Sequence, residues 1–460
     1  MGDPSVVRAV GLGVPVLATV ALAVWRQPDA RRLAAVLVAT AWAAVALIPV
    51  NLLALDVGWW TFDAEGAVWR GMPVDLWLAW ALLWGAVPAL VVPALSPWVV
   101  GATLVWGDLA FMPWGRPVVQ LGEGWLVGEA VAVLVALVPA LALASWSLGR
   151  RHVVARAWAQ AWCAGAVFVG GPLLVLEASP QGPGFVVGAG LQVALVVVLP
   201  AVAAMRELAQ VGKGTPLPYD PPTRLVTSGP YAYVRNPMQV SMTLLFVVLA
   251  AVCAEPVLLV GALATVAYSA GLAAWHEGRQ LEAAFGVRWR AYQASVPAWV
   301  PRLRPYAGRE ATLYVAADCA MCTGLARWLR ERSPVALTLR PASEHPDVLW
   351  RITYEADGVR AQGVFAFARA LEHLHLGWAM TGWGLSLPGV RHFAQLAADA
   401  FGAGPRPSRG RGEPCGAVGG IAPHGSQGEA GAPLPKALRQ IWSVVAVSVS
   451  RSRSSPSTKA

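Results

Sequence analysis

The sequence predicts a polytopic α-helical membrane protein with about nine transmembrane helices and a small C-terminal α/β domain. Of its 460 residues, 56% are hydrophobic and only 13% are charged, whereas soluble domains carry about 25% charged residues. Mean hydropathy is +0.53. The 23 tryptophans favour a bilayer interface, where the apolar ring is buried and the N–H stays hydrated. This composition excludes an ordinary soluble protein.

Nine apolar segments are long enough to be transmembrane helices, which need about 20 residues. The fourth is short, and Glu255-Pro256 divides the last two into a helical hairpin. The first is a retained span, because no signal-peptide cleavage site follows it. The segments are roughly 6–25, 33–55, 74–95, 98–113, 125–147, 157–177, 184–205, 238–254 and 256–275.

The charged loops predict the orientation. Basic residues gather in loops at 26–32, 150–156, 206–235 and 279–309, and acidic residues in the loop 56–72. Nine spans with the N-terminus outside place every basic loop in the cytoplasm, as the positive-inside rule requires. We therefore expect the chain after residue 276 to be cytoplasmic. Frequent Ala and Arg with little Lys is typical of a GC-rich bacterial genome, which indicates a bacterial cell membrane.

The net charge of +9 does not indicate nucleic-acid binding, because the basic residues flank apolar runs and form no stripe or known motif. The five cysteines give no disulfide framework. Cys163 and Cys253 lie in apolar runs and are expected to pack as hydrophobic residues. Only Cys319 and Cys322 form a closely spaced pair.

Residues 228–305 carry the clearest pattern of chemistry. A Gly-Pro turn is followed by Arg235 and by Pro237, which favours a helix start, so Arg235 should lie beside a helix N-terminus that attracts anions. The hairpin then returns Glu277 to the same depth. A cation and an anion at one membrane-surface cleft suit a zwitterionic ligand. A simple interfacial ion pair is the alternative.

The motif GPYAYVRNPM, followed by Glu277 and by LEAAFGVRWRAYQASVPAWVPR, resembles the isoprenylcysteine carboxyl methyltransferase and phospholipid methyltransferase superfamily over about 200–305. The resemblance implies S-adenosylmethionine at the cytoplasmic face, and a membrane lipid or a prenylated or otherwise lipid-linked acceptor. Gln239 and Gly278 depart from the family pattern, which commonly has an aromatic and a second acidic residue there. The implied cofactor contacts are Tyr231, Arg235, Asn236, Pro237 and Glu277, of which Arg235 and Glu277 are also the implied catalytic residues.

From about residue 311 the pattern changes to strand, Cys-bearing turn, amphipathic helix and strand. Later stretches at 348–356, 364–376 and 389–401 fit a strand and two helices. Cys319 and Cys322 follow the first strand and open the helix, a position that favours the reactive thiolate. No further metal ligands at suitable spacing accompany them, so we predict no metal site. Residues 372–375 (EHLH) are expected to form a solvated helix face.

Residues 311–402, with DCAMC and WGLSLPGVRHFAQLAADAFG, resemble the DCC family of thiol-disulfide oxidoreductase-like domains. The resemblance implies a thioredoxin-like fold, redox activity at Cys319 and Cys322 and a cytoplasmic thiol partner. Cysteines that only pack or regulate are the alternative. Residues 403–460, rich in Gly, Pro, Ser and Arg, predict a disordered tail.

The predicted domains are an N-terminal multi-span module (1–180), a methyltransferase-like membrane domain (181–308), a thioredoxin-like domain (309–402) and the tail (403–460). The first hypothesis is a membrane S-adenosylmethionine-dependent methyltransferase acting on a lipid-borne carboxylate or amine. A membrane-tethered thiol-disulfide oxidoreductase and a non-catalytic scaffold are the alternatives. The sequence leaves the oligomeric state open.

Acidic residues near or within spans are functional candidates by default. The N-terminal module has four, and each has an interfacial position as its alternative. They are Asp75, Asp108, Glu123 and Glu129.

Overall fold

The computed structural model describes residues 3–407, except Pro93, 217–219, Arg309, Asp318 and Asp357. Most of the tail predicted at 403–460, and the aspartate of the Asp-Cys-x-x-Cys motif, therefore lie outside the described residues.

Helices α1 to α7 form an N-terminal bundle. The side chain of Asp29 caps α2 by accepting from the amide of Arg32 at 2.8 Å. Strand β1 (Trp60–Phe62) pairs antiparallel with β4 (Val119–Leu121), and β2 (Val68–Trp69) pairs with β3 (Met72–Pro73). The helices are α1 (Pro4–Arg26), α2 (Ala30–Val57), α3 (Val74–Ala81), α4 (Val87–Val91), α5 (Pro97–Trp114), α6 (Trp125–Ala132) and α7 (Val138–Leu148), with π-helical turns at Leu82–Ala86 and Val133–Leu137.

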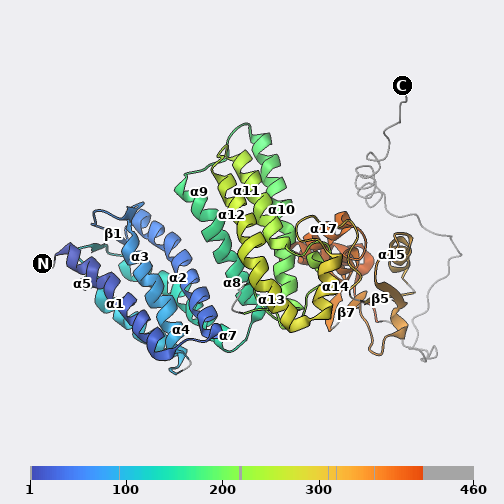
Figure 1. Ribbon diagram of the computed structural model, residues 1–460, viewed down its shortest axis with the longest axis horizontal. Coiled ribbons are helices and arrows are strands. Elements are labelled where there is room, and N and C mark those ends of the chain that lie inside the picture. The colour runs from blue at the N-terminus through green and yellow to red at the C-terminus, as the bar shows by residue number, and fades with distance from the viewer. Residues whose placement is uncertain are drawn as a thin grey trace, which may run out of the picture. The chain divides into compact units, whose positions relative to one another are not determined.

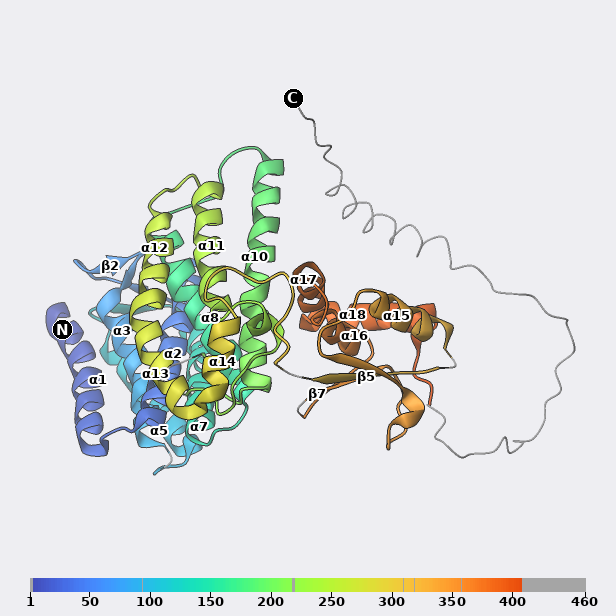
Figure 2. The same ribbon diagram turned by 45° about the vertical axis from the view of Figure 1, so that its right-hand side comes forward.

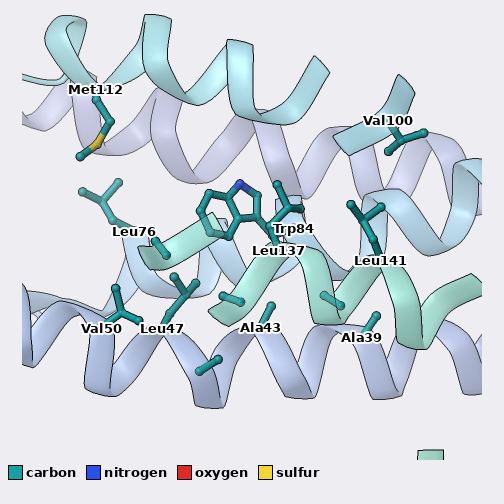
Figure 3. Packing of buried hydrophobic residues seen from close by; sticks show 14 of the residues in the cluster. Ala39, Ala43, Leu47, Val50, Leu76, Trp84, Val100, Met112, Leu137 and Leu141 are labelled. Atoms are coloured by element: carbon teal, nitrogen blue, oxygen red, sulfur yellow. The ribbon is translucent and has the colours of Figure 1, made fainter. Parts of the chain in front are cut away.

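Small residues allow the helices of this bundle to approach closely, which is how helices associate in membranes. Ala39 and Ala43 of α2 are fully buried. A Cβ added to Gly85 would lie only 2.4 Å from the Cα of Thr40, so no larger residue fits there. Trp84 is 1% exposed, and Figure 3 shows its indole in the middle of the cluster, between Leu76 and Leu137.

A second group of helices carries the region of residues 228–305. Helices α10, α11 and α12 pack side by side (Figures 1 and 2). The predicted Glu255-Pro256 turn lies between α11 and α12. The helices are α8 (Val153–Gly165), α9 (Gly171–Val175), α10 (Gly184–Gln210), α11 (Pro237–Val252), α12 (Leu258–Tyr268), α13 (Ala274–Phe285) and α14 (Val287–Ser295), with π-helical turns at Ala166–Gly170 and Ser269–Ala273.

Six helices in the described chain are long and apolar enough to cross a membrane, counting helices joined by π-helical turns as one. They are Pro4–Arg26, Ala30–Val57, Val74–Val91, Trp125–Leu148, Val153–Val175 and Gly184–Gln210. All nine predicted segments are helical, but the count of nine is not confirmed. Helix α5, with 18 residues, is long enough but not apolar enough, and Pro237–Val252 and Leu258–Gly271 are apolar but shorter than 18 residues.

The C-terminal α/β part contains a four-stranded sheet in the order β6-β5-β7-β8, with β5 parallel to β6 and the other pairs antiparallel. Helix α15 connects β5 to β6, and three helices follow β8. The elements are β5 (Ala311–Val315), α15 (Ala320–Glu331), β6 (Leu337–Pro341), β7 (Thr353–Ala356), β8 (Val359–Gln362), α16 (Val364–Leu371), α17 (Leu376–Leu385) and α18 (Pro388–Ala398).

The predicted strand at 348–356 contains β7, whereas β8, which forms a hairpin with it, was not predicted. Two local predictions for this part were wrong. The expected helix at 364–376 divides into α16 and α17, because the side chain of His375 caps α17 by accepting from the amide of Gly377 at 3.2 Å. The EHLH stretch is not a solvated face either. Its first residue, Glu372, is only 6% exposed.

Candidate functional site

Residues 228–236 form a tight turn that leads into α11. The turn contains the short 3₁₀ helix η4 (Gly229–Ala232), and Pro237 begins α11 as predicted. Gly229 has a φ of +60°, in the region that favours glycine. A Cβ there would also lie 3.2 Å from the Cγ of Glu207. Glycine therefore suits this position both in its backbone conformation and in the space available.

The segment after α14 holds the backbone of this turn. Four of its backbone groups bond to the turn, which fixes the direction of the side chains that the turn presents. The bonds run from Arg235 N to Pro297 O (2.9 Å), Asn236 N to Ala298 O (3.3 Å), Arg302 N to Tyr233 O (2.9 Å) and Tyr306 N to Ala232 O (2.8 Å).

The side chain of Arg235 is half-buried beside the N-terminus of α11. Its Nε donates to the carbonyl of Val296 at 2.8 Å, and none of the described residues accepts from its two terminal nitrogens. The hydroxyl of Tyr292, a residue only 2% exposed, donates to the carbonyl of Tyr231 at 2.8 Å. The bond from Nε to Val296 orients the guanidinium of Arg235. Its two terminal nitrogens remain for a ligand.

Glu277 lies exposed in the first turn of α13. Burial raises the pKa of the Tyr231 hydroxyl, and the nearby negative charge of Glu277 raises it further, which places that carboxylate close to the turn. Tyr231, Arg235 and Asn236 lie in the turn and Pro237 begins α11 directly after it, and Glu277 lies near them.

A buried ionic network lies beneath the turn, and sequence reasoning missed it. The guanidinium of Arg369 donates to both carboxylate oxygens of Glu207, at 2.7 and 2.9 Å, and lies 3.0 Å from the carboxylate of Glu372. Ser228 donates its hydroxyl to Glu207. The bidentate geometry is the strong form of this interaction, and it links the start of the turn to α16.

Two more bonds join the C-terminal part to the turn and to α10, which belong to the same compact unit. Tyr233 donates its hydroxyl to the carbonyl of Glu372 at 2.9 Å, and Arg206 donates to the carbonyl of Ser386 at 2.6 Å. The sequence contains one signal of this buried network. Glu207 lies near the end of the apolar helix α10 and Arg369 lies inside the apolar run VFAFARAL, and a charged residue in such a position needs a buried partner.

Cys319 is the N-cap of α15, directly after the turn that follows β5. Its sulfur accepts from the amide of Cys322 at 3.4 Å. Both thiols are half-buried. Cys163 and Cys253 are buried to 4% exposure, as predicted for packed hydrophobic residues.

The family model for phospholipid methyltransferase matches residues 185–288. The match runs from α10 to α13 and includes the turn, Glu207 and Glu277, while the N-terminal bundle and the α/β part lie outside it. It agrees with the predicted resemblance and suggests a membrane methyltransferase. No curated protein matches the chain, and no solved structure does.

Proposed function

We propose that this protein is an integral membrane methyltransferase that uses S-adenosylmethionine to methylate a lipid-borne carboxylate or amine. One observation carries the proposal. The match to phospholipid methyltransferase covers the turn in which Arg235, with two nitrogens directed to no described residue, lies beside a helix N-terminus and near Glu277.

The residues present fit the amino-acid end of that cofactor. Arg235 and the N-terminus of α11 together attract a carboxylate, since a guanidinium binds it bidentately and helix amides bind anions. Glu277 can accept from an ammonium group or a ribose hydroxyl. The bound cofactor supplies an electrophilic methyl group on a sulfonium. The protein's part is to hold that methyl in line with the acceptor, and a carboxylate acceptor needs no general base.

Replacing Arg235 with alanine should weaken S-adenosylmethionine binding by about 10- to 100-fold, the value of a charge-assisted hydrogen bond. Calorimetric titration of the purified full-length protein measures it. Glu277→Ala should also weaken binding. Arg235→Lys should bind more tightly than Arg235→Ala, because lysine keeps the positive charge but lacks the planar guanidinium that bonds a carboxylate through two nitrogens. Arg290→Ala, at an arginine 63% exposed and paired with Glu282, is the matched control. Binding unchanged in Arg235→Ala and Glu277→Ala would contradict the proposal.

A thiol-disulfide oxidoreductase function of the α/β part, with a thioredoxin-like fold, is the second candidate. The parallel β5–β6 pair with a helix between them, the antiparallel β7–β8 hairpin and the Cys319 cap of α15 support it. We also propose that this part faces the cytoplasm of a bacterial cell, where a protein thiol is the partner.

Cys319→Ser should then abolish thiol exchange with a small disulfide, because the sulfur at the helix N-terminus is the attacking atom. Release of the chromophoric thiol from Ellman's reagent is the measurement. Cys253→Ser is the matched control, since that thiol is buried. Equal rates in Cys319→Ser and the unmodified protein would exclude a redox role. If neither Arg235→Ala nor Cys319→Ser changes any activity, the scaffold alternative is favoured.

A further inference from the structure

Two buried carboxyl groups in the N-terminal bundle have no role in the proposed methyl transfer. Asp108 of α5 is 3% exposed and Glu129 of α6 is 4% exposed. The other two acidic candidates have ordinary positions, because Asp75 pairs with Arg8 at 2.8 Å and Glu123 is exposed. A carboxylate within a membrane helix is costly unless a cation or a proton compensates it.

No described cation compensates these two groups. One oxygen of Asp108 accepts from the indole of Trp80 at 2.9 Å. Its other oxygen, and one oxygen of Glu129, are buried without a hydrogen-bond partner among the described residues. The two carboxyl groups line the same cavity. Adjacent buried carboxyls that share one proton carry a single negative charge between them.

A cavity of about 60 Å³ adjoins both groups. One water needs about 15 Å³ of such volume, so the cavity has room for on the order of four heavy atoms. Indole rings form much of its wall, and the N–H of Trp84 is buried there with no described partner. Four tryptophans line it, namely Trp60, Trp77, Trp80 and Trp84.

The chemistry of this wall selects the kind of cation. Aromatic faces with a carboxylate suit an organic ammonium, which is attracted to the ring faces and whose methyl groups pack against them. A hard metal ion needs six or more oxygen ligands, and the described residues contain no cluster of three or more His, Cys, Asp or Glu side chains that could hold one. We propose that the cavity between Asp108, Glu129 and these tryptophans binds a small monovalent alkylammonium ion.

This site is separate from the turn at 228–236. Its lining comes from α2, α3, α5 and α6 with the short strands at their ends, such as Phe62 and Val119. It lies toward the end of α2 opposite the basic loop 26–32. The proposed cation therefore binds without S-adenosylmethionine.

Equilibrium dialysis of radiolabelled trimethylammonium against the purified full-length protein tests the proposal. We expect saturable binding that the double variant Asp108→Asn with Glu129→Gln weakens by at least about tenfold, since it removes both carboxyls that can hold the attracting charge at nearly constant shape. Glu123→Gln, an exposed carboxylate next to the same helix, is the matched control and should bind as the unmodified protein does. Arg235→Ala should also bind normally.

The ligand itself offers a second comparison that needs no variant. Trimethylammonium should raise the unfolding temperature of the unmodified protein, whereas tert-butanol, a neutral molecule of similar size, should not. The proposal is overturned if tert-butanol raises the unfolding temperature equally, or if sodium displaces the labelled trimethylammonium. It is also overturned if no saturable binding occurs, because Asp108 and Glu129 would then only share a proton. Loss of binding in Arg235→Ala would assign the ligand to the turn instead and would also overturn it.

Discussion

Replacing Arg369 with methionine should lower the free energy of unfolding by about 3–5 kcal/mol, the cost of removing one partner of a buried ion pair. The guanidinium is 2% exposed and contacts both Glu207 and Glu372. Without it, two carboxyl groups remain in a site that water does not reach. Methionine fills much of the same volume, so the loss reports the charge rather than a cavity. The midpoint of unfolding in mixed detergent micelles measures it.

Arg360→Met is the matched control for this change. Arg360 also pairs with a carboxylate, Asp347 at 3.3 Å, but both side chains are well exposed, and such pairs contribute about 0–1 kcal/mol. Equal effects of the two variants would show that Arg369 is not compensating buried charge. Because Ser228 and Tyr233 connect this network to the turn, Arg369→Met should also weaken S-adenosylmethionine binding, whereas Arg360→Met should not.

The turn at 228–236 was predictable because its signals are local. Gly229-Pro230 indicates the turn and Pro237 the helix start, because glycine permits the positive φ of the turn and proline fixes the φ that suits a helix start. The partners of the turn were not predictable. The carbonyls at 296–298 come from about 60 residues further along the chain, and the carbonyl of Glu372 comes from 139 residues beyond Tyr233. One sequence holds no information on such contacts.

The membrane helices were predictable from apolar length, whereas the C-terminal elements were predicted less well. Strand β8 has only four residues, VRAQ, too short a run to be recognised as a strand, so its hairpin with β7 was missed. The EHLH stretch was wrongly predicted to be solvent-exposed, because a polar pattern normally indicates a segment in contact with water. Glu372 is instead buried against Arg369 of the preceding helix and Glu207 of α10, and hydropathy does not distinguish a buried ionic network from a solvated face.

Glu372 should make the stability of this protein depend on pH. Burial raises the pKa of its carboxyl to about 7 from an ordinary value of 4.5, with Arg369 and Arg206 opposing the rise and Glu207 adding to it. Between pH 4.5 and 7 the folded state keeps a proton that the unfolded state has released. Stability therefore falls as pH rises through this window and changes no further above it, by about 3 kcal/mol in total.

The variant Glu372→Gln should abolish this slope, because the amide keeps an acceptor for Arg369 but cannot ionise. Above pH 7 it should be more stable than the unmodified protein, by up to about 3 kcal/mol, and below pH 4.5 the two should unfold alike. Unfolding midpoints across that range measure the difference, with the exposed Glu344→Gln as control. A slope that survives in Glu372→Gln would assign the pH dependence to another group. Since Tyr233 of the turn donates to the carbonyl of Glu372, cofactor binding should follow the same pH window.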